Sequence, residues 1–287
     1  MRSYIRPGEV SLAPPSASPV TGGGRLAIVV PLISGVLTAD EQVGMGLLRR
    51  FGGDWPKFVL HPAGLELGFH MTGLVSAPLD PANFDGISAY NAMLMSAWFY
   101  RLFEAYDHIL IFQTDCLLLS GEIAPWLDRP WSYSGAPYFR RNGQLKSVGN
   151  GGFSLRRVAD HIAVLDSGRL SLARTSPAMA RQYLKSTYLK YLLVHLARPA
   201  RQQGAAAFVA QFDRAEDEFW IYYAPLFSPR FSLPPAEAMA GFAAESRPRR
   251  VVELNGGRLP LGAHAWAKHD RAFWVEVLRD RLGVEVP

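Results

Sequence analysis

The chain has 287 residues, of which 49% are hydrophobic, so it is long enough for one large domain with a substantial core. Its single cysteine excludes an internal disulfide bond and fits a reducing compartment. The net charge of +5 at pH 7 suits anionic ligands such as nucleotides, whereas the lack of an arginine-rich run argues against nucleic-acid binding. No apolar run approaches the ~20 residues of a membrane-spanning helix, and early prolines rule out a secretory signal, so we expect a cytoplasmic protein.

Composition divides the chain into three parts. Residues 1–24 are rich in proline, serine and glycine and end in three consecutive glycines, which predicts a flexible tail. We expect residues 25–275 to form one domain, because nothing in the sequence marks a boundary between two independent units. Residues 276–287 hold the end of a short amphipathic helix and a C-terminal tail.

The first secondary-structure elements follow a recognisable order. A β-branched run at 26–30 predicts a strand. Thr38 and Glu41 then have the spacing of a capping box, and the amphipathic helix that they begin ends at Gly52. A second strand follows at 57–60. A strand, a helix and a strand at this spacing form a βαβ unit, so we predict a largely parallel sheet with right-handed crossovers.

Residues 64–87 show no clear periodicity. Ser88 is a suitable cap for a helix that runs to about residue 106. The apolar stripe of that helix is rich in aromatic side chains, and we expect it to lie in the core rather than to contact a ligand.

A short apolar run at 107–112 ends abruptly in Gln113, Thr114 and Asp115. A run rich in isoleucine and phenylalanine predicts a strand that is buried on both faces. A carboxylate at the end of such a strand lies at the edge where open α/β sheets bind their ligands. Asp115 is therefore the first candidate for a functional residue. The alternative is that Thr114 and Asp115 only cap a following turn.

A glycine-rich segment, 148–156, leads into another predicted helix. Its three glycines surround Asn150 and allow backbone N–H groups to approach an anion or sugar hydroxyls closely. The alternative is a tight turn that needs a positive φ angle. The G-x-G-x-x-G spacing of a dinucleotide site is missing.

Ser176 and Pro177 predict the start of a long helix that ends near Arg198. Basic residues and tyrosines alternate along it, so the helix 177–198 offers a surface for peripheral contact with the inner face of a membrane or with an anionic acceptor. The alternative is a solvated basic face with apolar packing beneath it.

Two further segments carry titratable side chains. Glu216 and Asp217 belong to an acidic cluster, which either begins a helix or raises the pKa of one carboxyl group and so provides a general base. His264 lies in a turn-rich segment and is either a metal ligand or a structural histidine.

Six segments together, in this order, resemble one family. They are Tyr90–Tyr100, Ile109–Asp115, Tyr133–Pro137, Val148–Arg156, Glu216–Trp220 and Leu259–Trp266. The family is a glycosyltransferase-like domain that is often found beside bacterial polysaccharide genes. The resemblance covers about residues 26–275, and Val148–Arg156 (VGNGGFSLR) is its most specific motif.

That family resembles the GT-A type of nucleotide-sugar glycosyltransferase. The resemblance implies a single GT-A-like (Rossmann-like) α/β domain with a mostly parallel, mixed central sheet flanked by helices. Residues 113–115 then stand where those enzymes carry Asp-x-Asp, which bridges a divalent cation (Mn²⁺ or Mg²⁺) and the donor diphosphate. Asp115 and His264 are the implied metal ligands, and Gln113 replaces the first aspartate, so one carboxylate ligand is lost.

The same resemblance implies roles for the other candidate residues. Asp217 is similar to the base that deprotonates the acceptor hydroxyl in inverting members, and Glu216 would orient its loop or contact the acceptor. The turn at 61–62 would help to hold the nucleoside. The residues expected to contact donor or acceptor are Val30, Pro31, Gln113, Thr114, Gly149, Asn150, Gly151, Gly152 and Arg156.

Two functional interpretations remain. The first is an inverting glycosyltransferase that moves a sugar from a nucleotide-sugar donor to a glycan, glycolipid or other hydroxyl acceptor in polysaccharide or glycoconjugate synthesis. The second, favoured by Gln113, is a non-catalytic member that binds nucleotide or glycan, or that scaffolds a polysaccharide assembly. A nucleotidyltransferase fits less well, because residues 30–33 offer no phosphate-binding glycine loop with a basic residue.

Overall fold

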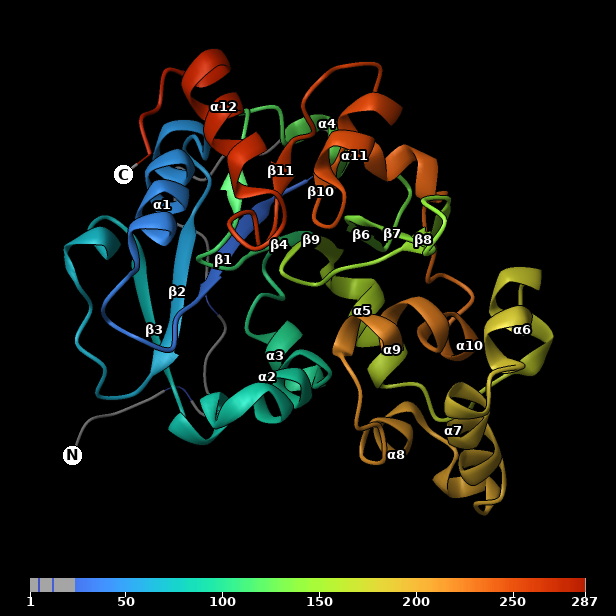
Figure 1. The fold of residues 1–287 in the computed structure, drawn as a ribbon. Coiled ribbons are helices and arrows are strands. Elements are labelled where there is room, and N and C mark those ends of the chain that lie inside the picture. Colours follow the sequence, from blue (N-terminus) through green and yellow to red (C-terminus); the bar gives the residue numbers. More distant parts are fainter. Residues whose placement is uncertain (1–4, 6–11, 13–23, 287) are drawn as a thin grey trace.

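A six-stranded sheet forms the centre of the computed structural model, which describes residues 5, 12 and 24–286 (Figure 1). The strand order is β3-β2-β1-β4-β9-β6. The first four strands are parallel, and β9 is antiparallel to both of its neighbours, so the predicted α/β fold with a mostly parallel, mixed sheet is confirmed. The strands are β1 (Leu26–Pro31), β2 (Lys57–Pro62), β3 (Val75–Leu79), β4 (His108–Phe112), β6 (Tyr133–Gly135) and β9 (Phe153–Arg157).

Helices cover both faces of this sheet. From β1 the chain passes through α1 (Ala39–Phe51) to β2, and from β3 it returns through α2 (Gly86–Leu94) and α3 (Ala97–Arg101) to β4. Because these two connections run in opposite directions along the sheet, right-handed crossovers place α1 on one face and α2 and α3 on the other. Strand β4, whose five residues are all buried, lies beside β1 at the point where the direction changes.

The capping box of α1 is present as predicted. The Thr38 hydroxyl accepts a hydrogen bond from the Glu41 backbone N–H at 3.3 Å, and the Glu41 carboxylate accepts one from the Thr38 backbone N–H at 2.8 Å. Gly52 ends the helix, as the sequence indicated. Strand β3 has no counterpart in the sequence analysis, because this edge strand carries a proline and alternates only weakly between buried and exposed residues.

The two long helices expected from the sequence are both interrupted. The helix predicted from Ser88 to residue 106 begins at Gly86 and is broken at Ser96, whose backbone is extended and whose hydroxyl donates to the Met93 carbonyl at 2.6 Å. The helix predicted over 177–198 divides into α6 (Pro177–Tyr183) and α7 (Ser186–Leu196), since Lys185 has extended dihedral angles. In the first helix, the short polar side chain of Ser96 competes for a backbone carbonyl, and in the second, one residue with extended backbone interrupts the turn. Each of these local effects outweighs the helical periodicity of the sequence.

The tyrosines of α6 and α7 point inward. Tyr183, Tyr188 and Tyr191 are buried, and they pack against aromatic side chains of α8 (Ala205–Val209) and α9 (Glu216–Tyr222) and against Tyr223, which lies between α9 and α10 (Ala224–Phe227). The predicted apolar packing beneath a basic face is therefore confirmed. No helix among the described residues is long and apolar enough to cross a membrane.

Smaller elements complete the fold. They are the strands β5 (Leu117–Leu118), β7 (Pro137–Phe139), β8 (Leu145–Val148), β10 (Ala243–Ala244) and β11 (Gly262–Ala263), and the helices α4 (Ala124–Leu127), α5 (Val158–Leu165), α11 (Pro248–Leu254) and α12 (Arg271–Leu282). A second apolar core lies between α1, α11, α12 and the three-stranded sheet β10-β11-β5.

The ends of the chain bear on the predicted division into three parts. Helix α12 crosses the expected boundary at residues 275 and 276. In the predicted tail, Ile5 donates a backbone hydrogen bond to Pro78 and Leu12 donates one to Leu102. Apart from these two residues and Gly24, the predicted tail lies outside the described residues.

Helix α1 offers a test of how closely it packs on the segment after β4. A Cβ atom on Gly44 would overlap the Cys116 carbonyl oxygen and lie 2.9 Å from that of Thr114, whereas a Cβ on Gly46 would meet no atom within 4 Å. We expect Gly44→Ala to lower the free energy of unfolding by roughly 1–3 kcal/mol, as overpacking does. The control Gly46→Ala, on the same helix, is expected to raise it by about 1 kcal/mol through helix propensity.

Urea denaturation of the two variants measures both changes. Equal stabilisation by Gly44→Ala and Gly46→Ala would contradict the close approach of α1 to residues 114–116.

Candidate functional site

The carboxyl ends of β1 and β4 open into a cavity of about 450 Å³, which we call the switch-point cavity. Open α/β sheets bind ligands at this position, because the two crossovers on either side leave a crevice between the strand ends. The cavity is lined by Pro31, Leu32, Ile33, Ser34, Val36, Leu37, Glu41, Gly86, Ile87, Tyr90, Gln113, Thr114 and Asp115. Four of the residues expected to form a site, Pro31 and 113–115, are therefore brought together here.

The polar side chains of this cavity are held by neighbours that the sequence analysis did not select. The Gln113 amide donates to the Tyr90 hydroxyl at 3.2 Å. The Thr114 hydroxyl donates to the carboxylate of Glu41, the same residue that caps α1. Both links fix the segment after β4 against the two helices that flank it.

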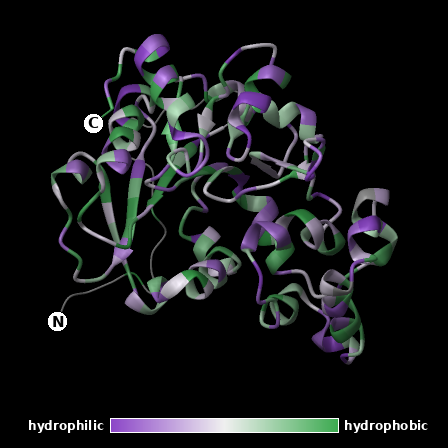
Figure 2. Ribbon diagram, in the orientation of Figure 1, coloured by the Kyte–Doolittle hydropathy of each residue, from purple (hydrophilic) through white to green (hydrophobic). Residues whose placement is uncertain are grey.

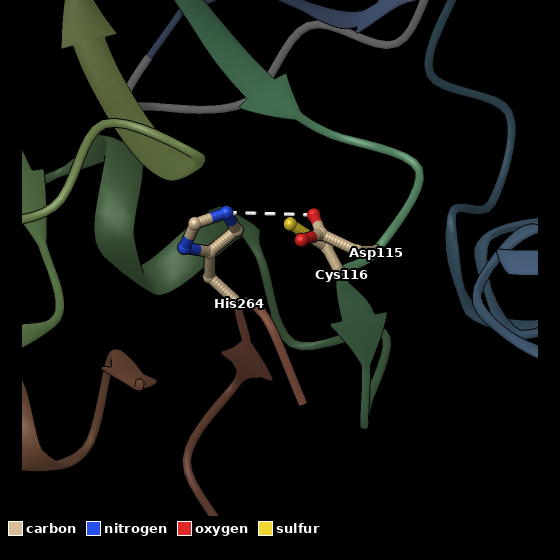
Figure 3. A group of neighbouring side chains, drawn as sticks. All are labelled: Asp115, Cys116 and His264. Carbon is tan, nitrogen blue, oxygen red and sulfur yellow. Dashed lines mark ion pairs between the residues drawn. The ribbon is translucent and has the colours of Figure 1, made fainter. Parts of the chain in front are cut away.

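His264 reaches the cavity edge through the small sheet. In that sheet Ala263 pairs with Leu117 and also with Ala244, so the residues next to each pair lie side by side. Cys116 therefore lies opposite His264 across the sheet, Asp115 is the adjacent residue, and Glu245 follows β10 on the other side of the histidine. The His264 Nε2 atom lies 3.4 Å from Asp115 Oδ1 (Figure 3). The Nε2 atom also lies 2.9 Å from Gln113 Oε1, and the Nδ1 atom lies 3.5 Å from Glu245 Oε1.

These carboxylates control the protonation of the histidine. Burial alone would lower the pKa of His264, but its contacts with Asp115 and Glu245 outweigh burial and raise the pKa to about 9. Burial likewise acts to raise the pKa of Asp115, and the contact with His264 outweighs it, so that pKa is lowered. Glu245 was not among the predicted site residues, because only the pairing of β10 with β11 brings it next to His264.

The side chains at this point fit a divalent cation. One ligand atom each from Asp115, Cys116 and His264 lie within 4.8 Å of one another. Cys116 is a poor ligand, because its thiol donates to the Gly152 carbonyl at 3.2 Å and burial raises its pKa well above the ordinary value. The carboxylate of Asp115, the amide oxygen of Gln113 and the imidazole of His264 remain, a set of oxygen and nitrogen donors that suits Mn²⁺ or Mg²⁺. Asp115 Oδ1 is buried and has no well-formed hydrogen bond among the described residues.

The glycine loop, residues 149–152, lies between β8 and β9 and beside this site. A Cβ atom on Gly149 would overlap the Tyr138 ring, one on Gly151 would overlap the Glu216 carboxylate and one on Gly152 would overlap the His264 ring. Protein side chains thus occupy the space that we expected a ligand to use. The alternative, a turn with positive φ, holds at Asn150, where φ is 46° and the side chain accepts from the Gly152 N–H at 3.0 Å.

Arg156, which we predicted to contact the donor or acceptor, is bound to groups of the protein itself. Its guanidinium group is fully buried and binds Glu216 through two hydrogen bonds, of 2.7 and 3.0 Å, and the Tyr100 hydroxyl through a third. The residue occupies an inward position on β9, where a charge is tolerated only when it is paired and hydrogen-bonded. Glu216 is correspondingly buried and is committed to this ion pair.

Asp217 follows directly in the first turn of α9. Its side chain is 6% exposed, the Tyr138 hydroxyl donates to Oδ2, and Oδ1 has no hydrogen-bond partner among the described residues. Burial, followed by the negative charge of Glu216, raises the pKa of Asp217 to about 7. Both interpretations of the acidic cluster therefore agree with the structure: the residues begin a helix, and the pKa of one carboxyl group is raised.

Asp217 and Asp115 lie on opposite sides of the glycine loop. Gly152 packs against His264 on the Asp115 side, whereas Gly149 packs against the ring of Tyr138, whose hydroxyl donates to Asp217. Asp217 does not line the switch-point cavity.

Two residues that we predicted for the nucleoside site are buried. Val30 is fully buried in the sheet, and only its neighbour Pro31 lines the cavity. His61 is also buried, and its Nε2 atom lies 2.8 Å from the Ser76 hydroxyl on the adjacent strand. Side chains within a strand point to the two faces of the sheet, and only residues at the strand end reach the cavity. The apolar run at 26–30 did not indicate which residue that would be.

Comparison with known proteins places these features in a wider group. A family model described as "Protein of unknown function (DUF5672)" matches residues 75–264, which include the glycine loop and both ends of the His264–Asp115 contact. No curated protein matches the chain significantly.

Several solved structures are similar to the chain at low identity. The bifunctional glycosyltransferase WbbM in its apo form is 11% identical, with a TM-score of 0.43 over 88% of this chain and 47% of that one. The apo glycosyltransferase GlyE of Streptococcus pneumoniae TIGR4 is 11% identical, with a TM-score of 0.37 over 84% and 54%. The glucosyl-3-phosphoglycerate synthase of M. tuberculosis is 12% identical, with a TM-score of 0.30 over 48% and 58%. The chain spans about half the length of these structures, and the similarities are too low to assign an activity.

The raised pKa of Asp217 predicts a pH-dependent stability. Its folded-state pKa of about 7 lies above the ordinary aspartate value of 3.8, so the folded state binds the proton more tightly and loses stability as the pH rises from about 4 to about 7. Asp217→Asn removes this ionisation. We expect the gain in unfolding free energy to be roughly 2 kcal/mol larger at pH 8 than at pH 5.

Urea denaturation at the two pH values measures the difference, with the exposed Asp128→Asn as the control. A gain that is the same at both pH values would show that Asp217 ionises normally.

Proposed function

The chain belongs to the family described as "Protein of unknown function (DUF5672)", and we propose that this member is a glycosyltransferase that takes its sugar from a nucleotide-sugar donor. The observation that carries the proposal is the position of Asp115, which leaves the end of the central strand β4, lines the switch-point cavity and faces His264. A carboxylate and an imidazole at the mouth of a nucleotide-sized cavity suit the binding of a diphosphate through a cation.

The donor would occupy the switch-point cavity. Residues 31–37 and Ile87 offer apolar walls for a nucleoside, and the polar residues 113–115 lie at the end where its diphosphate would be. The chain's own positive charge, +5 overall, favours such an anionic ligand.

Asp115, His264 and the Gln113 amide oxygen would hold the divalent cation. When bound, such a cation neutralises the negative charge that develops on a departing diphosphate. Glu245 orients the His264 ring from its far side, in the manner of a carboxylate behind a metal-bound histidine. Because the free histidine is protonated at neutral pH, cation binding would release a proton.

Asp217 would act as the general base toward the acceptor hydroxyl. A pKa of about 7 is well matched to proton transfer near neutral pH. Glu216 raises that pKa by its charge and holds the start of α9 through Arg156, so we assign it a positioning role. A base acting in a single displacement inverts the anomeric centre.

A nucleotide-binding protein without catalytic activity is the second candidate. Two observations favour it: Gln113 replaces a carboxylate, and Asp217 does not line the cavity that contains Asp115. Both candidates share the donor site and differ only in whether Asp217 reaches an acceptor.

The remaining partners follow from the same proposal. The acceptor would be a glycan or a glycolipid, used in the cytoplasm in polysaccharide or glycoconjugate synthesis by one domain that spans residues 25–275. The exposed face of α6 and α7 is the surface on which peripheral membrane contact would occur.

Binding of a nucleoside diphosphate tests the donor site. At about 100-fold its dissociation constant, a ligand raises the free energy of unfolding by ~2.7 kcal/mol. We expect Mn²⁺ to strengthen this effect in the natural chain, and Asp115→Ala to remove the Mn²⁺-dependent part because it removes the only carboxylate ligand.

Thermal-shift titration of a series of nucleoside diphosphates, with Mn²⁺ or with EDTA, makes the measurement. Asp128→Ala, a change at an exposed aspartate that does not line the switch-point cavity, is the control and should respond like the natural chain. A full Mn²⁺ effect in Asp115→Ala would place the cation elsewhere.

Turnover separates the two candidates. Asp217→Asn keeps the shape of the side chain but cannot accept a proton, so we expect sugar transfer to fall by ~10²–10⁴-fold while donor binding is unchanged. Asp128→Asn, the same change at an exposed aspartate, is the matched control.

The anomeric configuration of the product is read by NMR in the same assay. A retained configuration, or near-normal transfer by Asp217→Asn, would refute the role of Asp217. Donor binding with no transfer to any acceptor would favour the non-catalytic candidate.

A further inference from the structure

A second cavity, of about 750 Å³, is lined by Lys146, whose ammonium group lies over the Tyr138 ring, and is larger than the switch-point cavity. Its walls come from the hairpin strand β8, from α6, from the end of α9 and from residues 233–237. Part of the wall is apolar, with Met179 and Leu233 among its residues. We call it the basic cavity, because four cationic side chains line it.

Those four side chains are Arg140, Lys146, Arg181 and Lys185, and Glu237 is the single acidic residue in the lining. Within residues 24–286, none of the four takes part in an ion pair. Nearby Arg156 and Arg214, in contrast, are each paired with a glutamate. The cavity thus gathers positive charge that the protein does not neutralise.

The unfavourable electrostatics of this arrangement are evident at Lys146. Its ammonium group lies 5.7 Å from the ring centre of Tyr138 and 5.5 Å from that of Tyr222, and the side chain is half-buried. Burial lowers the pKa of Lys146, the charge of Glu218 partly opposes burial, and Arg140 lowers the pKa further. A bound anion would relieve both the burial and the repulsion.

We propose that the basic cavity binds the phosphate group of the acceptor. The inference rests on the proposed transferase function, and it names the class of acceptor for that reaction. Several convergent cations suit a doubly charged phosphate better than a single carboxylate. A phosphate at Lys146 would place the remainder of the acceptor next to the proposed base, because Tyr138 contacts the Lys146 ammonium group on its ring face and Asp217 through its hydroxyl.

Two sources can supply that phosphate, a soluble sugar phosphate or the headgroup of a lipid. The outer faces of α6 and α7 bear on the choice, since Leu184 is 84% exposed, Leu193 is 58% exposed and Val194 is 54% exposed. Figure 2 shows hydrophobic and hydrophilic residues side by side on these two helices. Helix α6 supplies Arg181 to the cavity, and Lys185 lies between α6 and α7. Such a face suits the surface of an anionic membrane.

Calorimetric titration of the full chain with inorganic phosphate, in EDTA, tests the site. We expect Lys146→Met, which keeps the aliphatic stem, and the exposed Arg181→Gln each to weaken binding at least ~10-fold, as loss of a charge-assisted hydrogen bond does. Arg250→Gln, an equal change of charge on α11, should bind like the natural chain.

Asp115→Ala should also bind phosphate normally, and it separates this inference from the proposed function. Loss of nucleotide binding alone would leave the basic cavity intact, whereas loss of phosphate binding alone would leave the donor site intact. The inference is overturned by a natural chain that does not bind phosphate, by unchanged binding in Lys146→Met and Arg181→Gln, or by an equal loss in Arg250→Gln.

Two further titrations identify the source. Glycerol 3-phosphate represents a soluble acceptor, and phosphatidylcholine vesicles with phosphatidic acid represent a lipid. Binding to vesicles that is lost in both Lys146→Met and the double variant Leu184→Ser/Leu193→Ser supports the lipid headgroup. Binding of glycerol 3-phosphate that is weakened by Lys146→Met, together with no binding to vesicles, supports the soluble acceptor. If either probe binds equally well to the natural chain and to Lys146→Met, the proposed site is wrong.

Discussion

The buried ion pair between Arg156 and Glu216 joins the central sheet to helix α9, and the rest of the site depends on it. Its two short hydrogen bonds allow a charge to remain in the core, where breaking such a pair costs ~3–5 kcal/mol. Because the Glu216 carboxylate lies against Gly151, the pair also fixes the glycine loop. The negative charge of Glu216 in turn raises the pKa of the adjacent Asp217. One interaction therefore sets the backbone, the helix position and the protonation of the proposed base.

The glycine loop separates two groups of side chains that would act on the two substrates. On one side Gly152 allows His264 to approach Asp115, and on the other Gly149 allows the Tyr138 ring to approach Asp217. Any side chain at these positions would push one group away from the other. The glycines therefore allow protein side chains to pack closely against the loop. The residues of the motif VGNGGFSLR are required because of the side chains that pack against them.

Local patterns in the sequence predicted the elements that local forces determine. The capping box at Thr38 and Glu41, the buried run of β4 and the placement of Asp115 at a strand end all follow from neighbouring residues. Long-range pairing decides the rest, so the sequence did not reveal that Glu245 lies beside His264 or that Arg156 is buried against Glu216. The two helix breaks, at Ser96 and Lys185, fall between these cases, because one or two residues outweighed a periodicity that continued past them.

The small sheet β10-β11-β5 affects the order in which the parts of the site are assembled during synthesis and folding. His264 contacts a residue 151 positions earlier in the chain, and the strands β5 and β11 that pair the two segments have two residues each. Contacts of such high sequence separation close large loops and form slowly. During synthesis, the residues that line the switch-point cavity, all within 31–115, emerge well before His264. The proposed cation site would therefore be completed only when the C-terminal part of the chain has folded.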